Sequence, residues 1–159
     1  MGVSGSGKTT IGRLLAERLS MPFYDADDFH SEANIKKMKD GIALNDEDRM
    51  PWLYTISKNL KDWQSNKGSV LACSALKESY REIFNENLES IIWVYLDGKF
   101  TDIDQRLKSR GHHYFNPALL HSQFDTLEIP DYGIKVPIDK SPDKIVDSII
   151  KNLNEDEKI

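Results

Sequence analysis

The stretch that decides the fold lies near the amino terminus and reads Gly2-Val3-Ser4-Gly5-Ser6-Gly7-Lys8-Thr9. It fits the pattern G-x-x-x-x-G-K-[ST], a loop whose backbone N–H groups surround a polyphosphate at the start of a helix. Its glycines let the backbone approach a phosphate closely. A helical pattern follows at once and argues against a merely flexible Gly/Ser-rich segment, because apolar residues recur on one face at Ile11, Leu14, Leu15 and Leu19. We therefore predict a binding site for ATP.

We expect each residue of this loop to contribute to that site. We expect the phosphates of ATP to be bound by Gly2, Val3, Ser4, Gly5, Ser6, Gly7, Lys8, Thr9 and Thr10. Lys8 should reach the β- and γ-phosphates, and Thr9 should ligate Mg²⁺. The start Met1-Gly2, with Ser6, also fits an N-myristoylation pattern. No basic cluster or second acylation motif accompanies it, so we set that interpretation aside.

The composition is typical of one soluble domain. The chain has 159 residues, of which 39% are hydrophobic and 30% are charged, and its net charge is −5. An acidic chain has no general attraction for nucleic acid or an anionic membrane, so an anionic ligand needs a local cluster of cations. The single Cys73 excludes an internal disulfide, and no apolar run reaches the roughly 20 residues of a membrane span. With no secretory leader before the loop, we expect a cytoplasmic protein without nucleic-acid or membrane partners.

Strand-like apolar runs alternate with helical patterns along the chain. This alternation predicts an α/β fold with a mainly parallel sheet that helices cover on both faces. We expect a single domain over residues 1–159. Helices are expected at 8–19, 30–40, 46–66, 79–85, 100–110 and from 141 onward. Strands are expected at 22–24, 69–73, 91–96 and 136–139, of which 91–96 is the strongest. Residues 110–130 are polar and aromatic with a short helical centre, and we expect them to form a mobile lid.

One element that the loop normally requires is missing from the pattern. A phosphate-binding loop usually follows a strand, and here Met1 alone stands before Gly2. In the usual order of such sheets that strand lies in the middle, so we expect two neighbouring strands with unpaired edges. We therefore expect the sequence to be a truncated product, an isoform or the result of a misassigned start.

Three carboxylates follow the first expected strand. Asp25, Asp27 and Asp28 lie at its carboxyl end, where open α/β sheets bind their ligands. Asp25 is a candidate to hold Mg²⁺ through water, and Asp27 is a candidate to accept a proton from an attacking hydroxyl. A solvated acidic turn is the alternative, but the phosphate-binding loop favours the catalytic interpretation.

Cationic side chains recur where an anionic substrate would need them, namely at Arg49, Lys77, Arg81, Arg106 and Arg110. Each alone suits a surface charge, whereas the set suits the binding of a carboxylate and the neutralisation of a transferring phosphoryl group. Four histidines lack the spacing of a zinc site and are interpreted as surface or substrate-facing groups: His30, His112, His113 and His121.

Taken in order, five stretches resemble the gluconokinase family of the thermoresistant, shikimate-kinase-like type. They are residues 2–9, 24–30 (YDADDFH), 44–49 (LNDEDR), 72–77 (ACSALK) with Tyr80-Arg81, and 122–128 (SQFDTLE). The resemblance covers nearly the whole chain and implies a P-loop fold like that of nucleoside-monophosphate kinases. It also implies transfer of the γ-phosphoryl group of ATP to the 6-hydroxyl of D-gluconate, which gives 6-phospho-D-gluconate for the pentose phosphate pathway. A Mg²⁺ requirement and commonly a homodimer are implied as well.

The resemblance further implies roles for single residues. It assigns catalysis to Lys8, Asp27 and Arg110, substrate binding to Asp27, Arg49, Lys77, Arg81 and His112, and metal binding to Thr9 and Asp25. Arg110 and His112 would belong to the lid, which reads SRGHHYF over 109–115 and is one residue out of step with the family's usual Arg-x-Gly-His-Phe arrangement.

Three alternatives stay open at this point. A shikimate kinase, or another kinase of a small polyhydroxy acid, would need the same types of Arg and Asp residues, because its acceptor is also a hydroxylated carboxylate. A GTPase-like switch would share the loop, but the sequence contains neither an Asn-Lys-x-Asp nor an Asp-x-x-Gly segment. A relative that binds nucleotide without turnover is the third, motivated by the missing strand.

Overall fold

The computed structural model describes residues 1–86, 88, 90–109 and 117–156. These residues contain seven α-helices, one 3₁₀ helix (η1) and four strands. Their bounds are α1 (Lys8–Leu19), β1 (Phe23–Asp25), η1 (Ala26–Phe29), α2 (Glu32–Lys39), α3 (Asp46–Ser65), β2 (Val70–Ala72), α4 (Glu78–Asn85), β3 (Val94–Asp97), α5 (Phe100–Ser109), α6 (Pro117–Thr126), β4 (Ile134–Pro137) and α7 (Pro142–Asp156).

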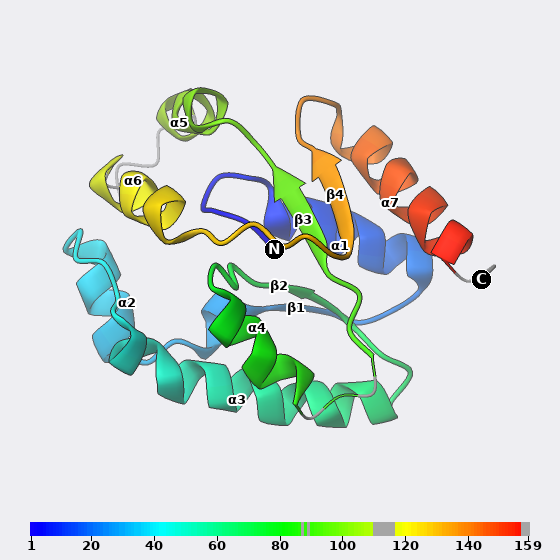
Figure 1. Ribbon diagram of the computed structural model, residues 1–159, viewed down its shortest axis with the longest axis horizontal. Coiled ribbons are helices and arrows are strands. Elements are labelled where there is room, and N and C mark those ends of the chain that lie inside the picture. Colours follow the sequence, from blue (N-terminus) through cyan, green and yellow to red (C-terminus); the bar gives the residue numbers. More distant parts are fainter. Residues whose placement is uncertain (87, 89, 110–116, 157–159) are drawn as a thin grey trace.

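The strands form two parallel pairs, β1 with β2 and β3 with β4 (Figure 1). Met1 and Gly2, the first two residues of the chain, lie between the pairs. The N–H of Leu96 donates to the carbonyl of Met1 (3.0 Å), and the N–H of Gly2 donates to the carbonyl of Ser74 (3.3 Å). These two residues thus link β3 to the segment after β2, where we expected unpaired edges, although no continuous ladder joins the pairs in the described part of the chain.

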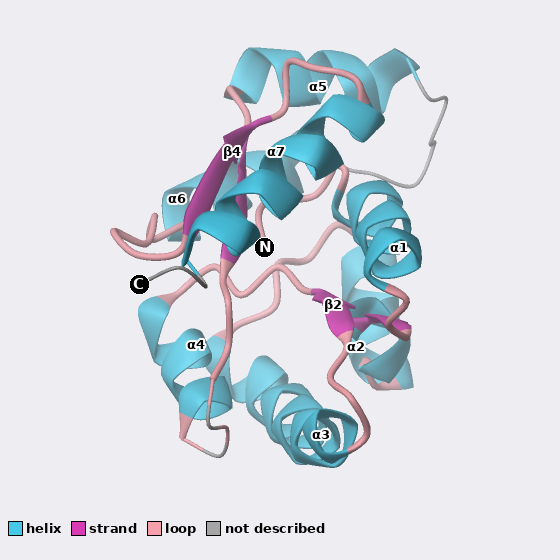
Figure 2. Ribbon diagram, turned by 90° about the vertical axis from the view of Figure 1, so that its right-hand side faces the viewer, coloured by secondary structure: helices cyan, strands magenta, loops and turns pink. Residues whose placement is uncertain are grey.

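Helices cover both sides of the strands because neighbouring residues of a strand point to opposite faces (Figure 2). Leu96 of β3 packs in one apolar cluster with residues of α1 and α7, such as Leu15 and Ile149. Its neighbour Tyr95 packs in a second cluster with residues of α3 and α4, such as Trp52. The predicted α/β fold, with a parallel sheet covered by helices, is confirmed.

Two expected strands are shifted along the chain. The strand predicted at 91–96 begins at Val94, because its partner β4 begins at Ile134, directly after Gly133 turns the chain with a φ of +74°. Among the described residues, no strand is paired with 91–93. The last strand, predicted at 136–139, runs from Ile134 to Pro137 because the register with β3 sets its ends. The other predicted elements agree to within about two residues at each end.

Local chemistry determines where the long helix α3 begins. The side chain of Asn45 accepts a hydrogen bond from the N–H of Asp48 (2.8 Å), and the Asp48 carboxylate accepts one from the N–H of Asn45 (3.1 Å). This reciprocal capping box satisfies two N–H groups that the helix itself leaves unpaired. Lys37 of α2 pairs with Asp48 at 2.6 Å and joins the two helices. Together these contacts fix the first turn of α3, which carries Arg49.

The close approach of β3 and β4 can be tested at Gly133, with Gly68 as a matched control. Both have a left-handed backbone, with φ of +74° and +78°. A Cβ on Gly133 would lie 2.4 Å from the carbonyl oxygen of Trp93, whereas a Cβ on Gly68 would lie 3.9 Å from Met21 Cε. We expect Gly68→Ala to lower the free energy of unfolding by about 1–2 kcal/mol from backbone strain alone, and Gly133→Ala to lower it further. Urea unfolding measures both values, and equal losses would contradict this account.

Candidate active site

A cavity of about 320 Å³ brings the predicted motifs together. It is bounded by the phosphate loop, η1, α2, the start of α3, the segment after β2, and α6. Its polar and charged lining includes Lys8, Asp27, His30, Lys39, Arg49 and Gln123. The structure therefore places Lys8 and Asp27, which were predicted from separate motifs, in one site.

The phosphate loop has the backbone conformation that glycine permits. Gly5 has a φ of +79°, and a Cβ there would lie 2.9 Å from the side chain of Leu107 on α5. The ammonium of Lys8 donates to the carbonyl of Val3 (3.0 Å), so it lies over the loop. Burial lowers the pKa of Lys8, and the charge of Asp27 opposes this shift. The cation is therefore held at the loop with a carboxylate as its counter-charge.

Asp25 joins the phosphate-loop helix α1 to the turn η1. One of its oxygens accepts a hydrogen bond from the hydroxyl of Thr9 (2.8 Å), and the other caps η1 by accepting the N–H of Asp27 (3.1 Å). Hydroxyl and carboxylate oxygens are ligands that Mg²⁺ accepts, so this pair fits the ion. The described residues contain no group of three His, Cys, Asp or Glu that could hold a metal. Nucleotide phosphates would have to supply further ligands.

Asp27 faces the cavity with an exposed carboxylate. Desolvation raises its pKa, the charge of Lys8 opposes the rise, and Asp25 adds to it. The side chain is 76% exposed, so solvent in the cavity screens part of this shift. A carboxylate with a raised pKa is a stronger base, which suits proton abstraction from a hydroxyl.

His30 lines the same cavity, and sequence analysis left it without a specific role. Its side chain is only 6% exposed, and its ring stacks on Trp52 with centroids 4.5 Å apart. Its Nε2 lies 3.9 Å from an Asp27 oxygen. Burial lowers the pKa of His30, so the neutral ring is favoured. Its place three residues after Asp27 could have identified it, because a 3₁₀ turn brings i and i+3 to one side.

The cations that were predicted to bind the substrate are divided by the structure. Arg49 lines the cavity and donates to the hydroxyl of Tyr80 at 3.2 Å. Lys77 lies outside the cavity lining, where it donates to both carboxylate oxygens of Asp46 at 2.8 Å. Lys39 of α2 lines the cavity although sequence analysis did not select it.

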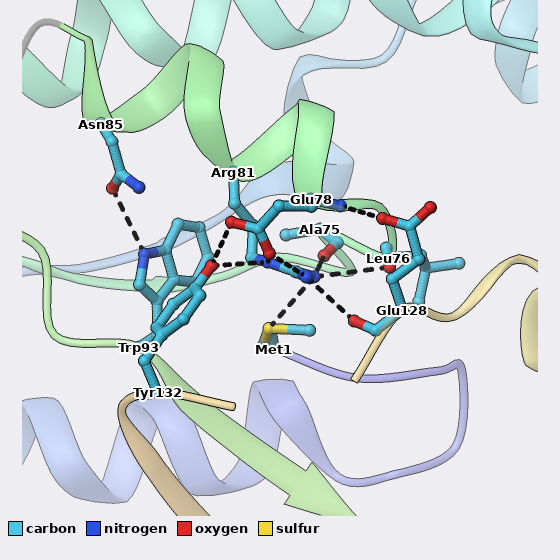
Figure 3. Close-up of polar contacts among 9 residues, drawn as sticks. All are labelled: Met1, Ala75, Leu76, Glu78, Arg81, Asn85, Trp93, Glu128 and Tyr132. Carbon is cyan, nitrogen blue, oxygen red and sulfur yellow. Dashed lines mark hydrogen bonds and ion pairs between the residues drawn. The ribbon is translucent and has the colours of Figure 1, made fainter. Parts of the chain in front are cut away.

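Arg81 is buried rather than directed into the cavity (Figure 3). Its side chain is 1% exposed, and its guanidinium donates to the carbonyls of Ala75 (2.8 Å) and Glu128 (2.9 Å) and to the hydroxyl of Tyr132 (2.9 Å). It also pairs with Glu78. With these contacts in place the guanidinium is not available to a ligand. Instead of the predicted substrate contact, the structure gives Arg81 a structural role between α4 and the segments that follow β2 and α6.

The remaining predicted residues lie either outside the described part of the chain or outside the cavity lining. Arg110 and His112 lie outside the described residues, as does the first part of the expected lid. Arg106 donates to the carbonyl of Ile138.

Burial raises the pKa of the Cys73 thiol to about 12, as befits an unreactive core residue. Among the described helices, none has the length and apolar character needed to cross a membrane.

Comparison with known proteins identifies the family. A family model described as "Shikimate kinase" matches residues 4–129. A "Probable gluconokinase" of Mus musculus is 44% identical in an alignment that covers 96% of this chain and 95% of that protein. The chain belongs to the gluconokinase family.

Two further relatives of this gluconokinase family member agree with that result. The "Thermoresistant gluconokinase" of Escherichia coli is 40% identical, over 95% of this chain and 89% of that protein. The crystal structure of a gluconokinase from Sinorhizobium meliloti has a TM-score of 0.90 at 36% identity, over 98% of this chain and 89% of that one. The resemblance inferred from five stretches of sequence is thus confirmed, as is the P-loop kinase fold.

We expect Lys8→Met to weaken the binding of ATP about 10- to 100-fold, because a charge-assisted hydrogen bond to phosphate is lost. Isothermal titration calorimetry with ATP measures the change. Lys36→Met is the control, since Lys36 lies on the surface of α2, 80% exposed, and pairs with Asp40. An unchanged affinity in Lys8→Met would contradict the role of Lys8.

Proposed function

We propose that this gluconokinase family member transfers the γ-phosphoryl group of ATP to the 6-hydroxyl of D-gluconate, giving 6-phospho-D-gluconate and ADP. The observation that carries the proposal is identity of 40–44%, over nearly the whole chain, to proteins that are themselves named gluconokinases. The cavity supports it, because a phosphate-loop lysine and an exposed carboxylate face the same space, together with cations for an acidic acceptor.

The proposed reaction is a direct displacement. The acceptor oxygen forms a bond to the γ-phosphorus while the bond from that phosphorus to the ADP oxygen breaks, and the hydroxyl proton passes to Asp27. Lys8 stabilises the negative charge on the phosphoryl oxygens. Arg49 and Lys39 supply positive charge for the gluconate carboxylate.

Thr9 and Asp25 are proposed to hold Mg²⁺, Thr9 through its hydroxyl and Asp25 through water. When bound, the ion would neutralise charge on the phosphates. Their mutual hydrogen bond keeps the two oxygens beside the first turn of α1, where the phosphates are expected. Titration of activity with MgCl₂ and EDTA tests the requirement.

Four further features are proposed from the sequence and the family resemblance alone. Arg110 would act in catalysis and His112 would contact the substrate. The protein would form a homodimer, which light scattering on the purified protein tests. It would be located in the cytoplasm, which imaging of a tagged protein tests.

The assay that tests the proposed function couples ADP release to a spectroscopic signal, with ATP, Mg²⁺ and a panel of acceptors. The panel contains D-gluconate, shikimate, other sugar acids and nucleoside monophosphates. We expect turnover with D-gluconate and not with shikimate. Turnover with shikimate alone would replace D-gluconate by shikimate as the acceptor. ATP binding without turnover on any acceptor would favour a catalytically inactive relative.

We expect Asp27→Asn to lower kcat about 10²- to 10⁴-fold, because the amide cannot accept the hydroxyl proton. The affinity for ATP should change little, since the phosphate-binding groups stay in place. Initial rates and calorimetric titration with ATP measure the two quantities. Full activity in Asp27→Asn would remove Asp27 from the role of base.

Arg49 and Lys77 form a matched pair for testing substrate recognition. Arg49→Ala removes a cation from the cavity and should raise the KM for gluconate about 10- to 100-fold. Lys77→Ala removes a cation that is already paired with Asp46 outside the cavity lining, so its KM should stay near the wild-type value. Steady-state kinetics with gluconate compares the two. A larger KM effect in Lys77→Ala would overturn the division that the structure indicates.

A further inference from the structure

Gln123 of α6 contacts the phosphate loop through both ends of its amide. Its Oε1 accepts the backbone N–H of Ser4 at 2.7 Å, and its Nε2 donates to the Ser4 hydroxyl at 2.9 Å. A backbone N–H can only donate, so it determines which end of the amide is the oxygen. Both residues line the cavity. The contact therefore connects segments 119 positions apart in the chain at the edge of the proposed reaction site.

Gln123 lies on a helix whose own position is well determined by packing. Leu120 of the same helix is completely buried in the apolar cluster of α1 and α7. Phe124, next to Gln123, meets Phe100 of α5 edge to face, with ring centroids 5.4 Å apart. A side chain on such a support is more precisely placed than one on a loop.

Polar contacts hold the end of the same helix (Figure 3). Glu128 follows α6, and its N–H donates to the carbonyl of Leu76 at 2.8 Å. The Glu128 carboxylate accepts the first N–H of α4, at Glu78. Its carbonyl accepts from Arg81. The segment that carries Gln123 is therefore attached to the wall of the cavity as well as to the core.

We propose that Gln123 is a positioning residue for phosphoryl transfer, which it serves by holding Ser4 and with it the cavity-facing end of the phosphate loop. This inference rests on the proposed function. Gln123 already occupies the N–H of Ser4, which we had expected to bind phosphate, so binding of ATP depends on Lys8 and the later N–H groups of the loop. Loss of Gln123 therefore displaces the reacting phosphorus relative to Asp27, whereas the affinity for ATP changes little. Small errors in that geometry lower the rate of the chemical step.

The test compares Gln123→Met, Ser4→Ala and the double variant with the wild type. Met has a similar length but lacks the two hydrogen bonds, so we expect kcat with gluconate to fall about 10- to 100-fold while the Kd for ATP stays near its wild-type value. Ser4→Ala removes one of the two contacts and should have a smaller effect. Because both changes act on one contact, the double variant should be little worse than Gln123→Met alone. Asp125→Asn is the control, since Asp125 is exposed on the same helix.

Two results would overturn the proposal. One is a wild-type kcat in Gln123→Met, with or without a lower Tm, since a residue that only stabilises the fold leaves the rate per folded molecule unchanged. The other is additivity of the effects of Gln123→Met and Ser4→Ala. Wild-type turnover of gluconate is measured first and tests the proposed function separately. If another acceptor is used instead, or only ATP hydrolysis occurs, the same ratios of variant to wild-type rates decide the role of Gln123.

Discussion

The site depends on the Asp25 carboxylate, which accepts hydrogen bonds from two different elements. One donor is the Thr9 hydroxyl at the start of α1, and the other is the N–H of Asp27 in η1. A single short side chain therefore sets the distance between the phosphate loop and the proposed base. Because each oxygen of the carboxylate is engaged, a shift of β1 along α1 would break at least one of the bonds. This constraint holds the phosphate loop and the aspartate-rich turn η1, which are separate motifs in the sequence, together in one site.

Burial acts on the charged groups of the cavity in a consistent direction, since it favours the uncharged form of each. It lowers the pKa of Lys8 and of His30, and desolvation raises that of the exposed Asp27, where solvent screens part of the shift. The attraction between Lys8 and Asp27 opposes the first two shifts. His30 is favoured in its neutral form, so it does not compete with Lys8 as a cation beside Asp27. The result is a carboxylate of increased basicity, with the positive charge located at the phosphate loop.

Most of the fold could be predicted because the relevant patterns are local. The glycine-rich loop, the helical stripe after it and the alternation of strands and helices each lie within one segment of sequence. The start of β3 at Val94 could not be predicted in this way, because it depends on where its partner strand β4 begins, far along the chain. For a similar reason, the sequence predicted the same role, substrate binding, for Arg49, Lys77 and Arg81. Their different roles depend on which carboxylates and carbonyls the fold brings to each, and sequence spacing does not report that.

Arg81 shows how a residue outside the cavity can determine its shape. Burying a guanidinium without partners would cost several kcal/mol, so its position requires that the surrounding carbonyls and carboxylate stay where they are. Two of those partners, Ala75 and Glu128, belong to the segment that forms a wall of the cavity and to the segment that ends α6. The same helix presents Gln123 to Ser4. The buried arginine is thus connected to the phosphate loop through the helix that it anchors.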